Sequence, residues 1–145
     1  MRREHTPQPI RANVPTTTGT GLEVPAQLCW TQQLPCEVRI ELFDRRAGVW
    51  RPWRISRDLL SDGLTRPAGD GDVRVEPFPH IPGIPGDVLL ALGHPWSTPR
   101  TALFLLHGPT VSGFLADTHR QIPPGREHIT IPDPRWFTQE GGGHA

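Results

Sequence analysis

Apolar and polar residues alternate between residues 22 and 55, which predicts a meander of β-strands. From Leu22 to Trp30 every second position is apolar, the two-residue period of a half-buried strand. The same period recurs over Glu37–Phe43, and Val49–Ile55 forms a third strand-like segment that Pro52 interrupts. Only a few turn residues separate these segments, so neighbouring strands are expected to pair antiparallel.

The stretch Trp53–Val75, WRISRDLLSDGLTRPAGDGDVRV, predicts the end of a strand, a short helix and a tight turn. Ser56 or Asp58 is suited to cap a helix of one or two turns. Gly63 stands where a left-handed C-cap residue is expected. The glycine and aspartate residues after Pro67 then predict a turn into a fourth strand.

The later part of the chain predicts two central strands and an amphipathic helix. Val88–Leu92 and Ala102–Leu106 are nearly continuous apolar runs, as expected for strands near the centre of a sheet. The segment PTVSGFLADTHRQI carries apolar residues at helical spacing, and Pro109 suits its first turn. The predicted fold is therefore α+β: a single domain with an antiparallel β-sheet and a few helices.

Both ends of the chain lack an apolar period. Residues 1–20 predict a flexible N-terminal arm, residues 21–132 the folded domain, and residues 133–145 a flexible C-terminal tail. No signal-peptide pattern is present, and no apolar run reaches the length of about 18 residues typical of a membrane helix. We therefore expect a cytoplasmic protein without membrane insertion, whose Cys29 and Cys36 are reduced thiols.

Charge is balanced over the whole chain and unbalanced in one segment. Fifteen arginines and no lysine face 15 acidic residues, so the net charge is zero, and this weighs against a nucleic-acid-binding protein. Residues 39–57 nevertheless hold six arginines against Glu41 and Asp44. This local excess fits either the solvated face of a strand pair or a docking surface for an acidic partner.

The segment AGDGDVR lacks the residues that phosphate-binding or calcium-binding loops require. A P-loop needs a lysine, and a dinucleotide fingerprint needs a glycine pair that opens a helix, whereas Gly69 and Gly71 precede a strand. Asp70 and Asp72 lack the closing glutamate of a calcium loop. The segment is interpreted as a turn.

No catalytic or metal-binding pattern is found elsewhere in the sequence. The seven histidines include no pair at i, i+4, and neither cysteine belongs to a Cys-x-x-Cys motif. No Gly-x-Ser-x-Gly motif is present. A metal site built from distant residues and a Cys–His pair stay open as alternatives, but the prediction is a protein that is not an enzyme and needs no cofactor.

Five tryptophans and no tyrosine suggest aromatic contact surfaces. Strand tryptophans can form a base-stacking platform, as in single-strand-binding proteins, or can serve as core residues and interface anchors. Trp50 and Trp53 are three positions apart, so they face opposite sides of a strand unless Pro52 introduces a bulge. The candidate partner-binding residues are Trp50, Trp53, Arg54, Trp96 and Phe114.

Three segments resemble the SsgA-like family of actinomycete sporulation and cell-division proteins. They are VPAQLCW, the stretch that begins at Trp53, and GFLADTHRQIPPGREH, and the resemblance runs from about Leu22 to Ile131. Its centre, RDLLSDGLTRPAGDGDVRV, is long and ungapped. The residues of this structural motif are Arg57, Asp58, Leu60, Gly63, Pro67, Gly69, Gly71 and Asp72.

The resemblance implies a whirly-like fold, similar to single-strand-binding proteins, that associates as a homo-oligomer, a trimer. It implies a non-enzymatic regulator or adaptor that is recruited to the septum and helps to position or time septum formation. The implied partners are other SsgA-like proteins and the tubulin-like division GTPase FtsZ. The alternative is a single-stranded nucleic-acid-binding protein with the same fold.

The resemblance also suggests roles within the motif and shows two departures from the family. Arg57 or Asp58 is expected to bond the loop backbone around residues 69–72. Leu34, Pro35 and Cys36 stand where the family pattern has Asp-Pro-Tyr. The C-terminal end lacks the apolar helix expected in the best-studied branch of the family, so a trimer or partner groove that needs this helix would not form in the same way.

Overall fold

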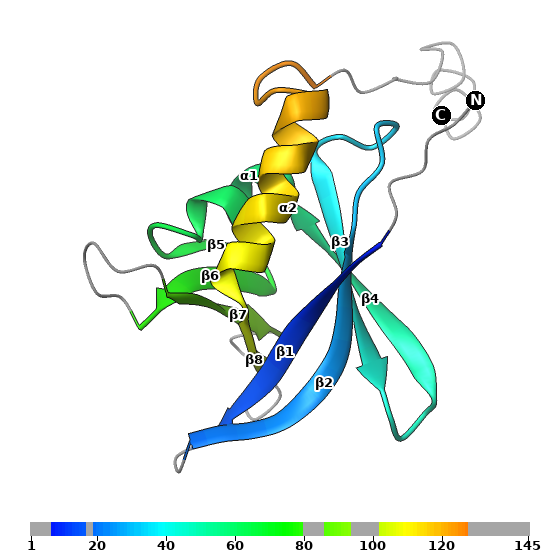
Figure 1. Ribbon diagram of the computed structural model, residues 1–145, viewed down its shortest axis with the longest axis vertical. Helices are drawn as coiled ribbons and strands as arrows, with labels where there is room; N and C mark the ends of the chain where they lie inside the picture. The colour runs from blue at the N-terminus through cyan, green and yellow to red at the C-terminus, as the bar shows by residue number, and fades with distance from the viewer. Residues whose placement is uncertain (1–6, 17–18, 80–85, 94–101, 128–145) are drawn as a thin grey trace, which may run out of the picture.

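A computed structural model describes residues 7–16, 19–79, 86–93 and 102–127. Within these residues the chain forms one antiparallel sheet and two helices (Figure 1). The strands are β1 (Gln8–Thr16), β2 (Gly19–Cys29), β3 (Glu37–Asp44), β4 (Val49–Ser56), β5 (Ala68–Asp70), β6 (Val73–Phe78), β7 (Asp87–Leu92) and β8 (Ala102–Leu106). The helices are α1 (Arg57–Asp62) and α2 (Gly108–Gln121).

The eight strands of the described residues form two consecutive meanders that meet in the middle of the sheet. The order across the sheet is β4-β3-β2-β1-β8-β7-β6-β5, so strands of the first half lie on one side and strands of the second half on the other. Among the described strands, backbone pairing joins the halves only between β1 and β8, through Ala12 opposite Leu106 and Asn13 opposite Leu105. The predicted α+β class and antiparallel sheet are confirmed, and β8 lies at the centre as expected.

The expectation of a flexible arm over residues 1–20 is wrong for β1. This strand pairs with β2 along most of its length and with β8 on its other side, and it buries Ile10 and Ala12. Pro9 and Pro15 obscured the strand pattern. Pro9 stands near the start of β1, and Pro15 lies where the register with β2 shifts, two positions where strands tolerate proline. The expected tail over residues 133–145 lies outside the described residues.

The hydrophobic core lies between the inward face of the sheet and the two helices. Leu28 and Ile40 come from the first half of the sheet, and Leu90 and Leu106 come from the second. Helix α2 crosses the sheet and adds Val111, Phe114 and Leu115 to the same cluster (Figure 1). Trp30, at the end of β2, is buried too and donates its indole N–H to the carbonyl of Pro35 at 3.0 Å.

Helix α1 begins as the sequence predicts and ends differently. Ser56 caps it, because its hydroxyl accepts a hydrogen bond from the backbone N–H of Leu59 at 3.2 Å. Gly63 has φ of −65°, a right-handed conformation, so the predicted left-handed C-cap is wrong. Glycine is needed here for space instead, since a Cβ at this position would lie 2.2 Å from Cγ1 of Val75.

Candidate partner-binding surfaces

The family motif forms a structural corner between β4 and β6, and its residues divide between core and surface. Arg57 and Leu60 are fully buried, and the exposed members are Asp58, Pro67, Gly69, Gly71 and Asp72. Arg57 Nη2 lies 2.6 Å from Glu127 Oε1, and Nη1 donates to the carbonyl of Thr118 at 3.3 Å. The expected bonds from Arg57 to the loop at residues 69–72 are therefore replaced by bonds to the end of α2 and the segment after it.

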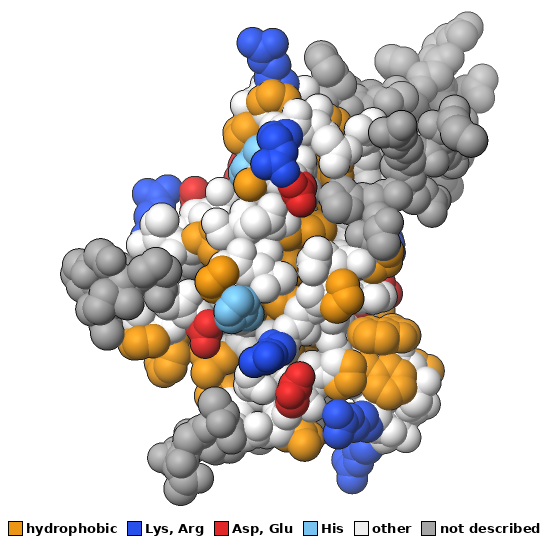
Figure 2. Space-filling view, in the orientation of Figure 1, with side chains coloured by type: hydrophobic (Ala, Val, Ile, Leu, Met, Phe, Trp, Pro, Cys, Tyr) orange, Lys and Arg blue, Asp and Glu red, His pale blue; other side chains and the backbone are white. Residues whose placement is uncertain are grey.

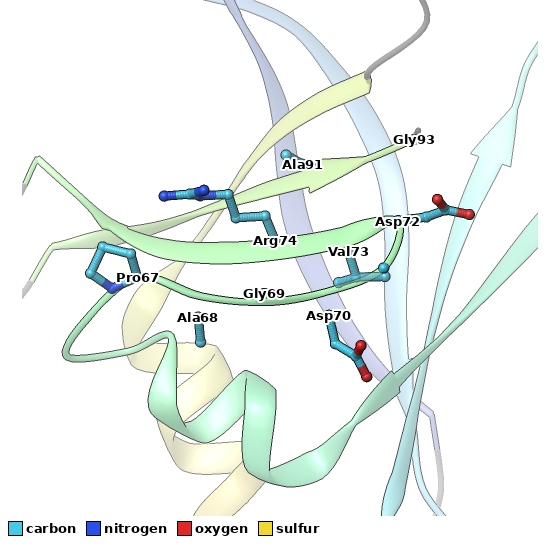
Figure 3. Close-up of a pocket in the computed structure, with 10 residues that line it drawn as sticks. Pro67, Ala68, Gly69, Asp70, Asp72, Val73, Arg74, Ala91 and Gly93 are labelled. Atoms are coloured by element: carbon cyan, nitrogen blue, oxygen red, sulfur yellow. The ribbon is translucent and has the colours of Figure 1, made fainter. Parts of the chain in front are cut away.

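The β5–β6 hairpin confirms the interpretation of AGDGDVR as a turn. Asp70 pairs with Val73, and Gly71 between them has φ of +58°, a conformation that favours glycine. The hairpin borders a shallow hollow of about 430 Å³ (Figure 3). In that view Asp72 and Arg74 point in opposite directions. The charged groups of these two residues therefore do not converge on a common point.

The outward face of the β3–β4 hairpin carries an aromatic pair, of which Trp50 is exposed and Phe43 is half-buried. Trp50 lies opposite Phe43 in the strand register, and their ring centroids are 5.3 Å apart. Trp50 is 42% exposed, and Val49 beside it is 43% exposed. We call Phe43 and Trp50 the outer aromatic patch; Val49 shares the opposite face of β4 with Arg51 and Trp53. Hydrophobic and arginine side chains are seen together over the end of this hairpin at the lower right of Figure 2.

Arginines on the β3–β4 pair are matched by carboxylates. Arg54 Nε lies 3.2 Å from Glu37 Oε1, and Arg39 Nη2 lies 3.7 Å from Glu41 Oε1. The Arg54 side chain is 73% exposed and the Arg39 side chain is 46% exposed, so each pair contributes little to stability. They do, however, offset much of the local positive charge of the outward face.

The inward face of β4 borders an apolar groove. Trp53 lies opposite Ile40, on the other side of the sheet from Trp50, so the predicted opposite orientation is confirmed and the register shows no bulge at Pro52. The concave groove has a volume of about 370 Å³. Its apolar lining comes from both halves of the sheet: Leu22, Val24, Leu42, Trp53, Leu92, Ala102 and Phe104. Phe43 also borders it, although its ring packs on Trp50 on the outward face. Its polar rim consists of Asp44, Arg45, Arg46 and Arg51.

The remaining predicted partner-binding residues do not join these surfaces. Phe114 is 3% exposed and packs in the core, so its ring is not available to a partner. Trp96 lies outside the described residues. The concave groove was missed from the sequence because its lining is spread over five strands. The available signals were the inward position of Leu22 in the alternating pattern and the arginine excess over residues 39–57.

Cys29 and Cys36 are the two thiol groups of the described part of the chain. Burial, together with a hydrogen bond from its thiol to Glu41, raises the pKa of Cys29 to about 11, so it is protonated at neutral pH. Cys36 is exposed, and both thiols are free. Among the described residues, His, Cys, Asp and Glu side chains form no group of three that could hold a metal ion. Neither described helix is long and apolar enough to cross a membrane.

Sequence comparison identifies the family. Residues 24–127 match the family described as Streptomyces sporulation and cell division protein, SsgA. The sporulation-specific cell division protein SsgB of Streptomyces coelicolor is 37% identical over 110 residues, which cover 75% of each chain. SsgB of Kineococcus radiotolerans is 35% identical over 120 residues, covering 81% of this chain and 70% of the relative.

Structural comparison gives the same family. One similar solved structure comes from work on SsgB, in which mutations in SsgB correlate to longitudinal cell division during sporulation of Streptomyces coelicolor. It has a TM-score of 0.70 and 31% identity and covers 88% of this chain and 98% of its own. The crystal structure of an SsgA-like sporulation-specific cell division protein from Thermobifida fusca has a TM-score of 0.73 over the whole of both chains. At 24% identity it supports the fold alone. The chain therefore belongs to the SsgA family of sporulation and cell division proteins.

Proposed function

We propose that this protein is a non-enzymatic adaptor of sporulation-specific cell division. It helps to position or time septum formation through contacts with other division proteins. Its relatives are sporulation-specific cell division proteins, which supports a role in sporulation division. The proposed partners are SsgA-like paralogues and FtsZ, and the proposed location is the cytoplasm, with recruitment to the septum.

The observation that carries this proposal is the outer aromatic patch. Exposed aromatic residues that adjoin arginines are typical anchors of protein–protein interfaces. Trp50 lies on β4, which is an edge strand of the sheet, so a partner can reach its indole ring without displacing another element. Arg54, on the same outward face, can supply a polar contact at the rim of such an interface.

The ion pairs on this face favour a protein partner over single-stranded nucleic acid. A nucleic-acid groove combines stacking aromatics with cations that are free to neutralise phosphates. Here Arg39 and Arg54 already face carboxylates, and the whole chain has no net charge.

We also propose the whirly-like architecture for the domain. We further propose that the protein forms a homo-oligomer, a trimer, and light scattering of the purified protein would test its molar mass.

The proposal is tested by imaging a fluorescent fusion in sporulating actinomycete filaments beside a nucleoid stain and a septum marker. We expect discrete foci at future septa. A matched fusion with Trp50→Ser should lose these foci, because the substitution removes the exposed indole. It should stay folded, since an aromatic contact such as Phe43–Trp50 is worth only about 0.5–1.5 kcal/mol.

Leu34→Ser is the control, because Leu34 is 53% exposed in the β2–β3 turn, at the other end of the strands. Foci that persist in the Trp50→Ser fusion would remove the aromatic patch from the proposal. A wild-type fusion whose signal follows the nucleoid would overturn the adaptor function and favour nucleic-acid binding.

A further inference from the structure

The concave groove is an apolar surface left open in the described part of the fold. Leu22, which borders it, is 62% exposed, and Trp53 and Phe104 are only partly buried against the core. An apolar hollow on a surface marks an interaction site more often than a single exposed leucine does. Its volume of about 370 Å³ is at the lower end of the range for binding pockets, roughly 300–1,000 Å³.

The shape of the groove favours side chains of a peptide over an enclosed small molecule. Drug-sized ligands usually bury most of their surface in a pocket, whereas this groove, as the described residues form it, is open along one side. The neighbouring edge of β4 is poorly suited to pair with an added strand, because Pro52 lacks an N–H and Arg51 and Arg54 flank it. A partner therefore gains more from inserting apolar side chains than from extending the sheet.

The rim of the groove determines the charge of that peptide. Arg51 Nε lies 3.2 Å from Asp44 Oδ2, so this arginine is matched. Asp44 also accepts hydrogen bonds from the backbone N–H groups of Arg46 and Ala47, which hold its pKa below the usual value. Arg45 donates to the neutral carbonyl of Glu23, and within the described residues neither Arg45 nor Arg46 forms an ion pair. Two exposed guanidinium groups thus remain uncompensated beside apolar surface.

We propose that the concave groove binds a short acidic segment of another protein, with one or two large apolar side chains in the groove and carboxylates on Arg45 and Arg46. Carboxylates match the planar guanidinium group in both charge and hydrogen-bond geometry. This inference rests on the proposed adaptor function and adds a second contact site, on the opposite face of β4 from the outer aromatic patch.

The test is selection of a random peptide library, displayed on phage, against the purified full-length protein. Recovered peptides should be enriched in Asp and Glu beside Leu, Phe or Trp. Synthetic copies of these peptides, labelled with fluorescein, should bind in solution with an affinity that falls as salt is raised. Leu22→Ser and Arg46→Glu should each weaken binding about tenfold.

Matched controls separate the groove from general surface effects. Leu34→Ser replaces a leucine of similar exposure in the β2–β3 turn, and Arg120→Glu reverses an exposed charge in the last turn of α2. Both variants should bind the selected peptides as the wild type does. All four substituted side chains are exposed, so circular dichroism should show each variant folded.

The proposal is overturned if the selection recovers no binder or if its peptides lack acidic residues. It is also overturned if the controls weaken binding as much as Leu22→Ser and Arg46→Glu do. A fall in molar mass of the Leu22→Ser variant, measured by light scattering, would overturn it by assigning the groove to contacts between copies. If septal foci form but no acidic peptide binds, the groove proposal fails and the adaptor function stands.

Discussion

At the residue scale, the buried guanidinium of Arg57 joins three segments that are distant in sequence. Its side chain contacts Glu127, 70 residues further along the chain, and the carbonyl of Thr118 at the end of α2. It also lies 5.8 Å from the centroid of a Trp30 ring, within range of a cation–π contact. One charged group therefore connects the start of α1 with the end of the described fold.

Arg57→Ala should lower the free energy of unfolding by about 1.5–3 kcal/mol, the range for hydrogen bonds to charged groups. Urea denaturation followed by circular dichroism measures this change. Arg66→Ala is the control, because the Arg66 side chain is 71% exposed and its pair with Asp62 contributes little. Equal stability of the two variants would mean that the Arg57 contacts do not hold the corner together.

Stability should fall in two steps as pH falls from neutral. Burial, assisted by the Arg57 charge, lowers the pKa of His119, so the unfolded state binds more protons below about pH 6.5 and stability begins to decrease there. The hydrogen bond from Arg57 lowers the pKa of Glu127, so a second decrease begins below about pH 4.5. Thermal melting over this pH range measures both steps.

Glu127→Gln isolates the second step of the pH profile. The variant lacks the carboxylate, so its melting temperature should fall less steeply below about pH 4.5 than that of the wild type. The decrease that begins near pH 6.5 should remain, because His119 is unchanged. Parallel profiles for the two proteins over the whole range would contradict the assignment to Glu127.

The motif predicted that Arg57 is structural, but it did not predict the atoms that Arg57 binds. Nothing in the local sequence links Arg57 to Glu127, because that contact depends on how α2 packs and on the path of the segment that follows it. The nearer aspartate-rich loop was the simpler hypothesis. Side-chain pairs separated by many residues depend on tertiary packing, which a single sequence does not reveal.

At the element scale, the C-terminal end of α1 meets β6 with almost no space between them. Gly63 ends the helix where its backbone meets the Val75 side chain. In helix α2 there is free space around Gly113, because an added Cβ would meet no atom of the described structure within 4 Å. The same substitution should therefore have opposite effects in the two helices.

Gly63→Ala should destabilise the protein by about 1–3 kcal/mol, because the methyl group overlaps Val75 and the packed elements must move apart. Gly113→Ala should stabilise it by about 0.5–1 kcal/mol, since alanine is the better helix former. Both values come from urea denaturation. A tolerated Gly63→Ala would show that α1 can shift away from β6 without loss.

Elements with a clear period, and the antiparallel meander from β2 to β4, could be predicted from the sequence, whereas the strand β1 and its pairing could not. The segments β3, β7, β8 and α2 follow their apolar patterns closely. The strand β1 was missed because its two prolines suggested irregular structure, yet pairing on both sides outweighs local preference. The concave groove was missed for a similar reason, since curvature brings together strands that are far apart in sequence.

At the scale of the whole molecule, the two halves of the sheet depend on one strand. In the described residues only β1 connects the β2–β4 meander to the β5–β8 meander through backbone pairing. The concave groove is lined from both halves, so its shape depends on this connection. The N-terminal segment is thus part of the core.

Deletion of residues 1–16 should abolish the cooperative unfolding transition. It removes β1, the buried Ile10 and Ala12 and both of the strand's pairings. Deletion of residues 1–6 removes no part of β1 and should leave the transition in place. Differential scanning calorimetry compares the two proteins. A normal transition after the longer deletion would restore the flexible-arm interpretation.

The pairing of β1 with β8 also bears on how the protein is made. β1 is synthesised first, but its partner β8 leaves the ribosome only when nearly all of the described fold has been translated. The first four strands can form their meander early, yet the β1 edge stays unpaired during translation, and such edges promote aggregation. A chain that stops before Ala102 would keep that edge exposed, so the sheet can be completed only after β8 has left the ribosome.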